Sequence, residues 1–195
     1  MLKTPENFYR TQIQVFSEAL KKCVVTNQSR EQIQFEDTLN EITNLFSLVR
    51  QTKNSIAVIG NGGSAAVASH AKIDLINVGK IRTLSLHESS VITCMANDYG
   101  YEQSFAQQIP ILLSIGDVLI AISSSGCSKN ICNAVDIAVK LGIKIVTFSG
   151  FSHENPLRFK GSYNFWLNAS DYGIVEIGHQ FILHNIVDRL RLKFN

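Results

Sequence analysis

The sequence predicts a three-layer α/β fold: a doubly wound parallel sheet with helices on both faces, preceded by an N-terminal helical hairpin. Two patterns lead to this prediction. From residue 55 onward, short continuous apolar runs alternate with helical stretches, and such runs are typical of strands buried on both faces of a parallel sheet. Before residue 54, apolar residues recur at alternating intervals of three and four, the spacing of amphipathic helices. We therefore expect a helical pair over residues 1–53, which takes part in oligomerisation, and an α/β domain over residues 54–195.

Two apolar stripes predict the N-terminal helices. The first is Tyr9, Ile13, Phe16, Leu20 and Val24, and the second is Phe35, Leu39, Ile42, Phe46 and Val49. Asn27 and Gln28 would form the turn between them, and Ser29 with Gln32 has the pattern of a capping box that opens the second helix. Stripes of this length need a surface to pack on. Two alternatives remain open: the pair covers its own domain, or it also packs against a second subunit.

The α/β domain is predicted element by element. The expected strands are 56–59, 83–86, 118–122 and 145–148, with a less regular fifth strand at 164–167. Helices are expected at about 64–77, at 88–113 with a break near 97–100, at 129–141 and at 174–193. Strands that alternate with helices in this way form a parallel sheet covered on both sides.

Composition and charge exclude several classes of protein. The chain has 18 Lys and Arg residues against 16 Asp and Glu residues, and this small, evenly spread positive charge does not indicate a nucleic-acid partner. No apolar run approaches the length of about 20 residues that a membrane span requires. The 4 cysteines show no CxxC spacing and the first residues do not resemble a secretory leader. These features predict reduced thiols, a cytoplasmic location and no membrane or nucleic-acid partner.

Two loops point to a phosphate-bearing ligand. The glycine loop, residues 60–64, follows the first strand of the α/β domain, and the serine loop, residues 123–128, follows the third. Each loop opens a helix, and helix N-termini at the carboxyl ends of parallel strands bind anions. The glycine loop has neither the GxGxxG pattern of dinucleotide sites nor the Gly-Lys-Ser/Thr of a P-loop. We therefore expect no nucleotide cofactor.

Four motifs resemble a known family. GNGGSAAVASH at 60–70, ANDYGYE at 96–102, DVLIAISSSGCSKN at 117–130 and VEIGHQFILH at 175–184 are similar to the sugar isomerase (SIS) domain, in its phosphoheptose isomerase branch. The resemblance covers nearly the whole chain and implies a SIS-type, flavodoxin-like fold. It also implies conversion of D-sedoheptulose 7-phosphate to D-glycero-D-manno-heptose 7-phosphate, a step toward bacterial surface glycans. The resemblance also implies a homotetramer with active sites at subunit contacts. Several members of the branch hold zinc at these sites.

The same resemblance implies roles for individual residues. The phosphate would be bound by Ser123, Ser124, Ser125 and Ser128, and the sugar by Asn61, Gly62, Gly63, Ser64, Asn97, Asp98 and Glu176. Asp74 and His184 would be catalytic, and the zinc ligands would be His70, Asp74, Glu176 and His184. The branch usually has Glu where this chain has Asp74 and Gln where it has Glu176.

The chemistry of the residues agrees with this outline. An aldose–ketose isomerisation needs a base that moves a proton between adjacent carbons and an acid that moves a proton between oxygens. His70 and Asp74 are one helical turn apart and share a face, a spacing that also suits two metal ligands. Glu176 and His184 are eight residues apart, a rise of about 12 Å. One metal could join them only through extended side chains or with help from another subunit.

Two alternatives to the isomerase remain open. One is a non-catalytic SIS protein that binds a phosphosugar for a regulator, or binds a protein partner such as the DnaA replication initiator. The other is an isomerase or deaminating synthase for amino-sugar phosphates, which the chain favours less because it has one SIS-like unit and no glutaminase portion.

Overall fold

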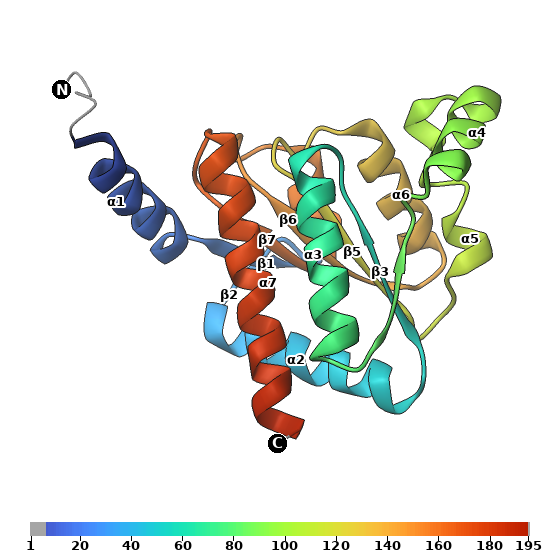
Figure 1. Ribbon diagram of the computed structural model, residues 1–195, viewed down its shortest axis with the longest axis horizontal. Helices are drawn as coiled ribbons and strands as arrows, with labels where there is room; N and C mark the ends of the chain where they lie inside the picture. The colour runs from blue at the N-terminus through green and yellow to red at the C-terminus, as the bar shows by residue number, and fades with distance from the viewer. Residues whose placement is uncertain (1–6, 195) are drawn as a thin grey trace.

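The computed structural model describes residues 7–194 (Figure 1). Its seven strands form one sheet, in the order β2-β1-β7-β6-β5-β3-β4. The strands are β1 (Val24–Asn27), β2 (Gln32–Ile33), β3 (Ser55–Ile59), β4 (Arg82–Ser85), β5 (Val118–Ser123), β6 (Lys144–Ser149) and β7 (Tyr163–Trp166). β3 to β7 run parallel to one another, whereas β1 is antiparallel to both β7 and β2. All five strands expected in the α/β domain are present, which confirms the predicted fold.

The helices cover both faces of the sheet (Figure 1). They are α1 (Phe8–Lys21), α2 (Phe35–Gln51), α3 (Gly63–Asn77), α4 (Ser89–Tyr99), α5 (Ile109–Leu112), α6 (Lys129–Lys140) and α7 (Tyr172–Phe194), with two 3-10 helices, η2 (Tyr101–Gln103) and η3 (Pro156–Phe159). The predicted interruption of the long stretch 88–113 is confirmed, because α4 ends at Tyr99 and η2 follows Gly100.

Two hydrophobic cores lie on opposite faces of the sheet. Along β3, Ile56 and Val58 belong to the core under α2, α3 and α7, whereas Ala57 and Ile59 belong to the core under α5 and α6. This division follows from the geometry of a strand, whose successive side chains point to opposite faces. Every side chain of β3 and β5 is buried, which explains their uninterrupted apolar sequences.

The connection between the first two helices differs from the prediction. A β-hairpin, β1 and β2, joins α1 to α2, so the two helices do not form a helical hairpin with a short turn. Val24 begins β1 instead of ending the first helical stripe. The capping box of Ser29 and Gln32 is wrong, because Gln32 pairs with Thr26 in the sheet and α2 begins only after Gln34. The cause is the pairing of β1 with β7, a partner too distant in sequence to affect a local pattern.

Part of the N-terminal region belongs to the core of the α/β domain. Val25 of β1 and Phe46 of α2 are 1% exposed and pack in the core under α3 and α7. α1 lies farther out and projects beyond the sheet (Figure 1), with Phe16 in edge contact with Phe181 of α7. The division at residues 53 and 54 stays a prediction. Among the described residues, no helix combines the length and hydropathy that a membrane span requires.

Candidate active site

The glycine loop and the serine loop lie side by side, because they follow the neighbouring parallel strands β3 and β5. The glycine loop leads into α3, and the serine loop leads into α6. Together with the start of α7 they enclose a cavity of about 360 Å³, lined by Asn61, Gly62, Gly63, Ser64, Ser123, Ser124, Ser125, Ser128, Tyr172 and Glu176. All of these except Tyr172 are residues that the sequence singles out. The structure therefore brings most of the predicted substrate-binding residues to one cavity.

Hydroxyl groups and helix N-termini give this cavity the character of an anion site. The Ser123 hydroxyl donates to Ser128 Oγ at 3.1 Å, and the Ser64 and Ser124 hydroxyls lie 3.3 Å apart. No side chain caps α3 or α6 at its N-terminus, at Gly62 and Ser128 respectively. Among the described residues, the N–H groups of the first two residues of each helix, Gly63 and Ser64 in α3 and Lys129 and Asn130 in α6, have no such cap and can bind an anion at the positive ends of the helix dipoles.

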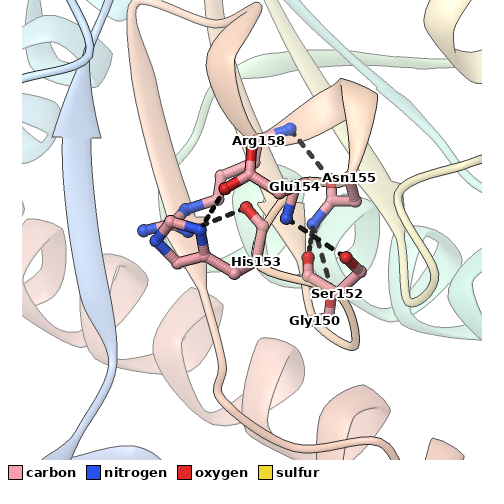
Figure 2. A network of polar contacts seen from close by, with 6 residues as sticks. All are labelled: Gly150, Ser152, His153, Glu154, Asn155 and Arg158. Carbon is pink, nitrogen blue, oxygen red and sulfur yellow. Dashed lines mark hydrogen bonds and ion pairs between the residues drawn. The ribbon is translucent and has the colours of Figure 1, made fainter.

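The serine loop rests on the segment that follows β6. Asn155, which is 1% exposed, donates to the carbonyl groups of Gly150 and Ser152 at 3.1 and 2.9 Å and accepts from the Arg158 backbone N–H at 3.0 Å (Figure 2). A Cβ at Gly126 of the serine loop would lie 1.9 Å from Asn155 Oδ1. The Leu157 N–H donates to the Gly126 carbonyl at 3.1 Å. Close packing and these bonds hold the serine loop in one conformation.

A buried arginine stabilises the same segment. Arg158 donates through Nη1 to the His153 carbonyl at 2.9 Å, and its guanidinium stacks 4.4 Å from the Trp166 ring centroid. Burial lowers the pKa of Arg158, and nearby Glu154 partly offsets that effect. His153 Nδ1 lies 2.6 Å from Glu154 Oε1 on the exposed side of the loop (Figure 2). These contacts stabilise the segment after β6 on which the serine loop packs.

A carboxylate lies inside the cavity. The Glu176 side chain covers Gly63, and a Cβ at Gly63 would lie 2.2 Å from Glu176 Oε2. Only glycine leaves room for the carboxylate in this position. Because Gly63 begins α3, the Glu176 charge lies at the positive end of that helix dipole, a favourable placement for an anion.

Three further side chains meet where α3 packs beside α7. Asp74 Oδ2 lies 3.4 Å from His70 Nε2 and 3.2 Å from His184 Nδ1, and the two imidazole centroids are 4.8 Å apart. This Oδ2 atom is buried and accepts no well-aligned hydrogen bond from a described residue. The candidate ligand atoms of the three residues all lie within 4.8 Å of one another. Such a set is suited to a divalent metal or to proton transfer.

Comparison with known proteins identifies the family. The SIS domain profile matches residues 24–150. The chain is 31% identical over 159 residues to the phosphoheptose isomerase of Thermodesulfovibrio yellowstonii, covering 77% of this chain and 79% of that protein. It is 36% identical over 139 residues to the phosphoheptose isomerase of Helicobacter pylori strain P12, covering 68% of each. The chain belongs to the SIS domain family, in its phosphoheptose isomerase branch.

A solved SIS structure shares the whole fold. The phosphoheptose isomerase from Francisella tularensis superposes with a TM-score of 0.80 at 21% identity, covering 96% of each chain. At this identity the likeness supports the fold alone. Because it covers 96% of this chain, the likeness includes residues outside the range 24–150 that the SIS profile matches.

The metal set implied by the SIS resemblance is only partly assembled. His70, Asp74 and His184 come together. Two of the separations between their ligand atoms, 3.4 and 3.2 Å, are close to the edges, about 3.3 Å long, of a tetrahedron with zinc bonds of about 2.0–2.1 Å, and the three atoms together spread over up to 4.8 Å. The chemistry of this set, with its buried Asp74 oxygen, is suited to a divalent cation such as zinc. Glu176 does not join it, because it lies in the cavity two helical turns before His184 on α7.

Asn97 and Asp98 lie outside the cavity. Both are exposed on α4, where Asn97 donates to Asp98 at 2.9 Å and the Cys94 thiol lies 3.6 Å from Asp98. Their predicted role in sugar binding stays a prediction.

Sequence reasoning missed several residues of the site. Tyr172 lines the cavity at the start of α7, and Asn130 and Tyr101 bind Asn61. His87 Nε2 lies 2.8 Å from the carbonyl of Gly60, the first residue of the glycine loop, and burial lowers the pKa of its imidazole. Tyr101 and Asn130 fall within the quoted SIS motifs, so their place in those motifs is a signal that could have drawn attention to them. His87 and Tyr172 carry no comparable signal.

Proposed function

We propose that this chain is an isomerase that converts D-sedoheptulose 7-phosphate to D-glycero-D-manno-heptose 7-phosphate. The observation that carries the proposal is the placement of an anion cavity and a His–Asp–His set along the same two helices, α3 and α7. Membership of the phosphoheptose isomerase branch supports it. In this proposal the serine loop binds the phosphate, and the reacting carbons lie toward Asp74.

The length of a heptose phosphate agrees with this arrangement. Glu176 at the cavity and His184 in the His–Asp–His set are eight residues apart on one helix, a rise of about 12 Å. An extended chain advances about 1.2 Å per single bond, so the eight bonds from phosphorus to C1 of a heptose 7-phosphate span about 10 Å. With its phosphate in the cavity, such a substrate places C1 and C2 near the second group of residues.

The proposed proton movements use Asp74 and His184. The Asp74 carboxylate removes a proton from C1 of the ketose, and a proton is delivered to O2, which gives an enediol. Asp74 then returns its proton to C2 while O1 loses its own, and His184 carries the proton between the two oxygens. Asp74 Oδ2 faces the two imidazoles, so Oδ1 is the oxygen that takes the carbon-bound proton.

Zinc is a further part of the proposal. His70, Asp74 and His184 would hold it, and a bound zinc ion would polarise the substrate oxygens at C1 and C2. Metal analysis of the purified protein and of a His70→Ala variant tests this assignment. We expect close to one zinc per chain in the wild type and much less in the variant.

We also propose a homotetramer. α3 exposes Ile73 and Ile76, and α7 exposes Ile177 and Phe181, beside the His–Asp–His set. These apolar side chains, with Tyr9 and Ile13 on α1, support coverage by other copies of the chain. Light scattering at micromolar concentration tests the proposal, and a monomeric mass would contradict it. The cytoplasmic location expected from the sequence stays a prediction.

Activity is tested directly with D-sedoheptulose 7-phosphate. The purified protein should form an aldose phosphate, which chromatography of the sugar phosphates detects. The Asp74→Asn variant should bind the ketose but not convert it. If wild type and variant bind the ketose equally tightly and neither converts it or any other ketose phosphate, the isomerase proposal is wrong. That outcome would support the non-catalytic alternative, a phosphosugar-binding or DnaA-binding protein.

A further inference from the structure

Two amide side chains connect the glycine loop to the first turn of α6. Asn61 Nδ2 donates to Asn130 Oδ1 at 2.8 Å, and Asn130 Nδ2 donates to Asn61 Oδ1 at 2.9 Å. Tyr101 of η2 adds a third bond, donating its hydroxyl to Asn61 Oδ1 at 3.1 Å. Asn130 is 2% exposed and does not line the cavity, whereas Asn61 does.

A backbone group determines which way both amides face. The Ile131 N–H lies 3.0 Å from Asn130 Oδ1, and a backbone N–H can only donate. The atom of Asn130 that it contacts must therefore be the oxygen, which leaves Nδ2 to face Asn61. Because Nδ2 also only donates, the facing atom of Asn61 must be its own oxygen. The orientation of Asn61 thus follows from the fold and needs no ligand to set it.

These bonds leave the Asn61 amide with one unused hydrogen-bonding group, an N–H donor. Its Oδ1 accepts from Asn130 and from Tyr101, which uses both lone pairs. Its Nδ2 carries two N–H groups, of which Asn130 takes one. Toward the cavity Asn61 can therefore donate a hydrogen bond but cannot accept one.

We propose that Asn130 is a positioning residue that makes Asn61 a fixed hydrogen-bond donor, so that this wall of the cavity selects an acceptor such as a phosphate or carbonyl oxygen. The inference rests on the proposed function, because it assumes that the cavity binds a phosphosugar. Tyr101 assists by occupying the remaining lone pair. A hydrogen bond from Asn133 Nδ2 of α6 to the Glu102 carbonyl of η2, at 3.0 Å, holds η2 against α6.

A double-mutant cycle separates positioning from a general structural effect. Dissociation constants for inorganic phosphate and for D-sedoheptulose 7-phosphate are measured by calorimetry for wild type, Asn61→Ala, Asn130→Ala and the double variant. Since a hydrogen bond to a charged group is worth about 1.5–3 kcal/mol, losing the Asn61 bond should weaken binding about 10- to 100-fold. Asn130→Ala should weaken binding at least fivefold in the wild-type background but less than twofold when Asn61 is already alanine.

Asn133→Ala is the matched control. It lies one turn farther along α6, contacts η2 and does not touch Asn61, so its effect on binding should be under twofold and equal in both backgrounds. If Asn130→Ala lowers the melting temperature too far for measurement, Tyr101→Phe at an exposed position replaces it in the same cycle, with a smaller expected loss of about twofold to fivefold.

The outcomes distinguish this inference from the function on which it rests. The positioning role is wrong if Asn130→Ala, or its replacement Tyr101→Phe, weakens phosphate binding by the same factor whether residue 61 is asparagine or alanine. Binding and turnover by the wild type would still support the proposed function in that case. A wild-type protein that bound neither inorganic phosphate nor the ketose phosphate would overturn the proposed function itself, and the positioning role with it.

Discussion

Glu176 and Gly63 touch inside the cavity, with the carboxylate of the first lying against the backbone of the second. The cavity therefore contains an anion at the N-terminus of α3, and the N-terminus of α6 at the serine loop has none. An incoming phosphate should bind at the serine loop and avoid Glu176. This asymmetry orients a phosphosugar, with its phosphate toward α6.

The first prediction concerns the charge of Glu176. Replacing it with glutamine keeps the shape and removes a negative charge that repels phosphate. Charges several ångströms apart at an effective dielectric constant of about 20 interact by about 1–2 kcal/mol after screening, so Glu176→Gln should tighten phosphate binding by roughly 5- to 30-fold. Calorimetry at low and high salt checks this, and the gain should shrink as salt increases. Weaker binding in the variant would show that the carboxylate does not oppose the anion.

The second prediction concerns the serine loop. Replacing Ser123 and Ser125 together with alanine removes two hydroxyls from the cavity and should weaken sugar-phosphate binding by about 2–4 kcal/mol, if each lost bond contributes about 1–2 kcal/mol. Cys127→Ala is the control, because Cys127 is exposed on the same loop and does not line the cavity. If the double variant binds the sugar phosphate with unchanged affinity, the serine loop is not part of the binding site.

The third prediction compares two glycines with positive φ. Gly126 has φ +67° and faces the buried Asn155, whereas Gly62 has φ +53° and a Cβ there would meet nothing within 4 Å. Both substitutions by alanine incur the backbone cost of about 1 kcal/mol, but Gly126→Ala adds a clash with an immobile side chain. We expect Gly126→Ala to lose at least twice as much free energy of unfolding as Gly62→Ala, measured by urea denaturation. Equal losses would contradict the close packing of the serine loop.

The fourth prediction tests Asp74 as the base. Asp74→Asn keeps the size of the side chain and removes the proton acceptor, so turnover should fall by about 100- to 10,000-fold while the KM for the ketose changes little. Asp74→Glu keeps the carboxylate on a side chain one methylene longer and should retain activity. Zinc content is measured for each variant, which separates loss of the base from loss of the metal. An Asp74→Asn variant with undiminished turnover would exclude this carboxylate as the base.

Local patterns predicted the loops of the site because each loop lies within one strand-turn-helix unit. Gly62 and Ser128 are the N-cap residues of α3 and α6, in loops that follow apolar runs that fold as predicted. The parallel sheet then places both loops at one edge. The contacts of Glu176 with Gly63 and of Asn130 with Asn61 join separate units, and no local pattern contains such information. The same reason explains why the pattern places Val24 in the first helix instead of β1, since Val24 follows Leu20 at a helical interval and its strand partner Trp166 lies far along the chain.

The fifth prediction follows from a buried histidine. His179 is fully buried, its Nε2 lies 3.0 Å from the Ser149 carbonyl and its Nδ1 has no hydrogen-bond partner among the described residues. Burial lowers the pKa of His179 from its ordinary value of 6.5 to about 4. Between these values the unfolded chain binds a proton that the folded chain does not, so stability is complete above pH 6.5 and is lost as the pH falls toward 4.

The size of this effect is measurable. At 1.36 kcal/mol per pKa unit, His179 should destabilise the fold by about 2–3 kcal/mol on acidification from pH 7 to pH 4.5. His179→Gln keeps a donor for the Ser149 carbonyl and does not titrate, so its free energy of unfolding should fall less over the same range. Urea denaturation at both pH values gives the comparison, and parallel losses in the two proteins would assign the acid sensitivity to other groups.

The pairing of β1 with β7 also affects how the protein is made. The Asn164 amide donates to the Thr26 carbonyl across a separation of 138 residues, and Val25 aligns with Phe165 in the same ladder. On the ribosome, Thr26 of β1 emerges 138 residues before its partner Asn164 of β7. Contacts this distant in sequence form late in folding. A nascent or truncated chain that lacks β7 therefore leaves the edge of β1 opposite β2 unpaired, and such exposed edges make incomplete products prone to aggregation.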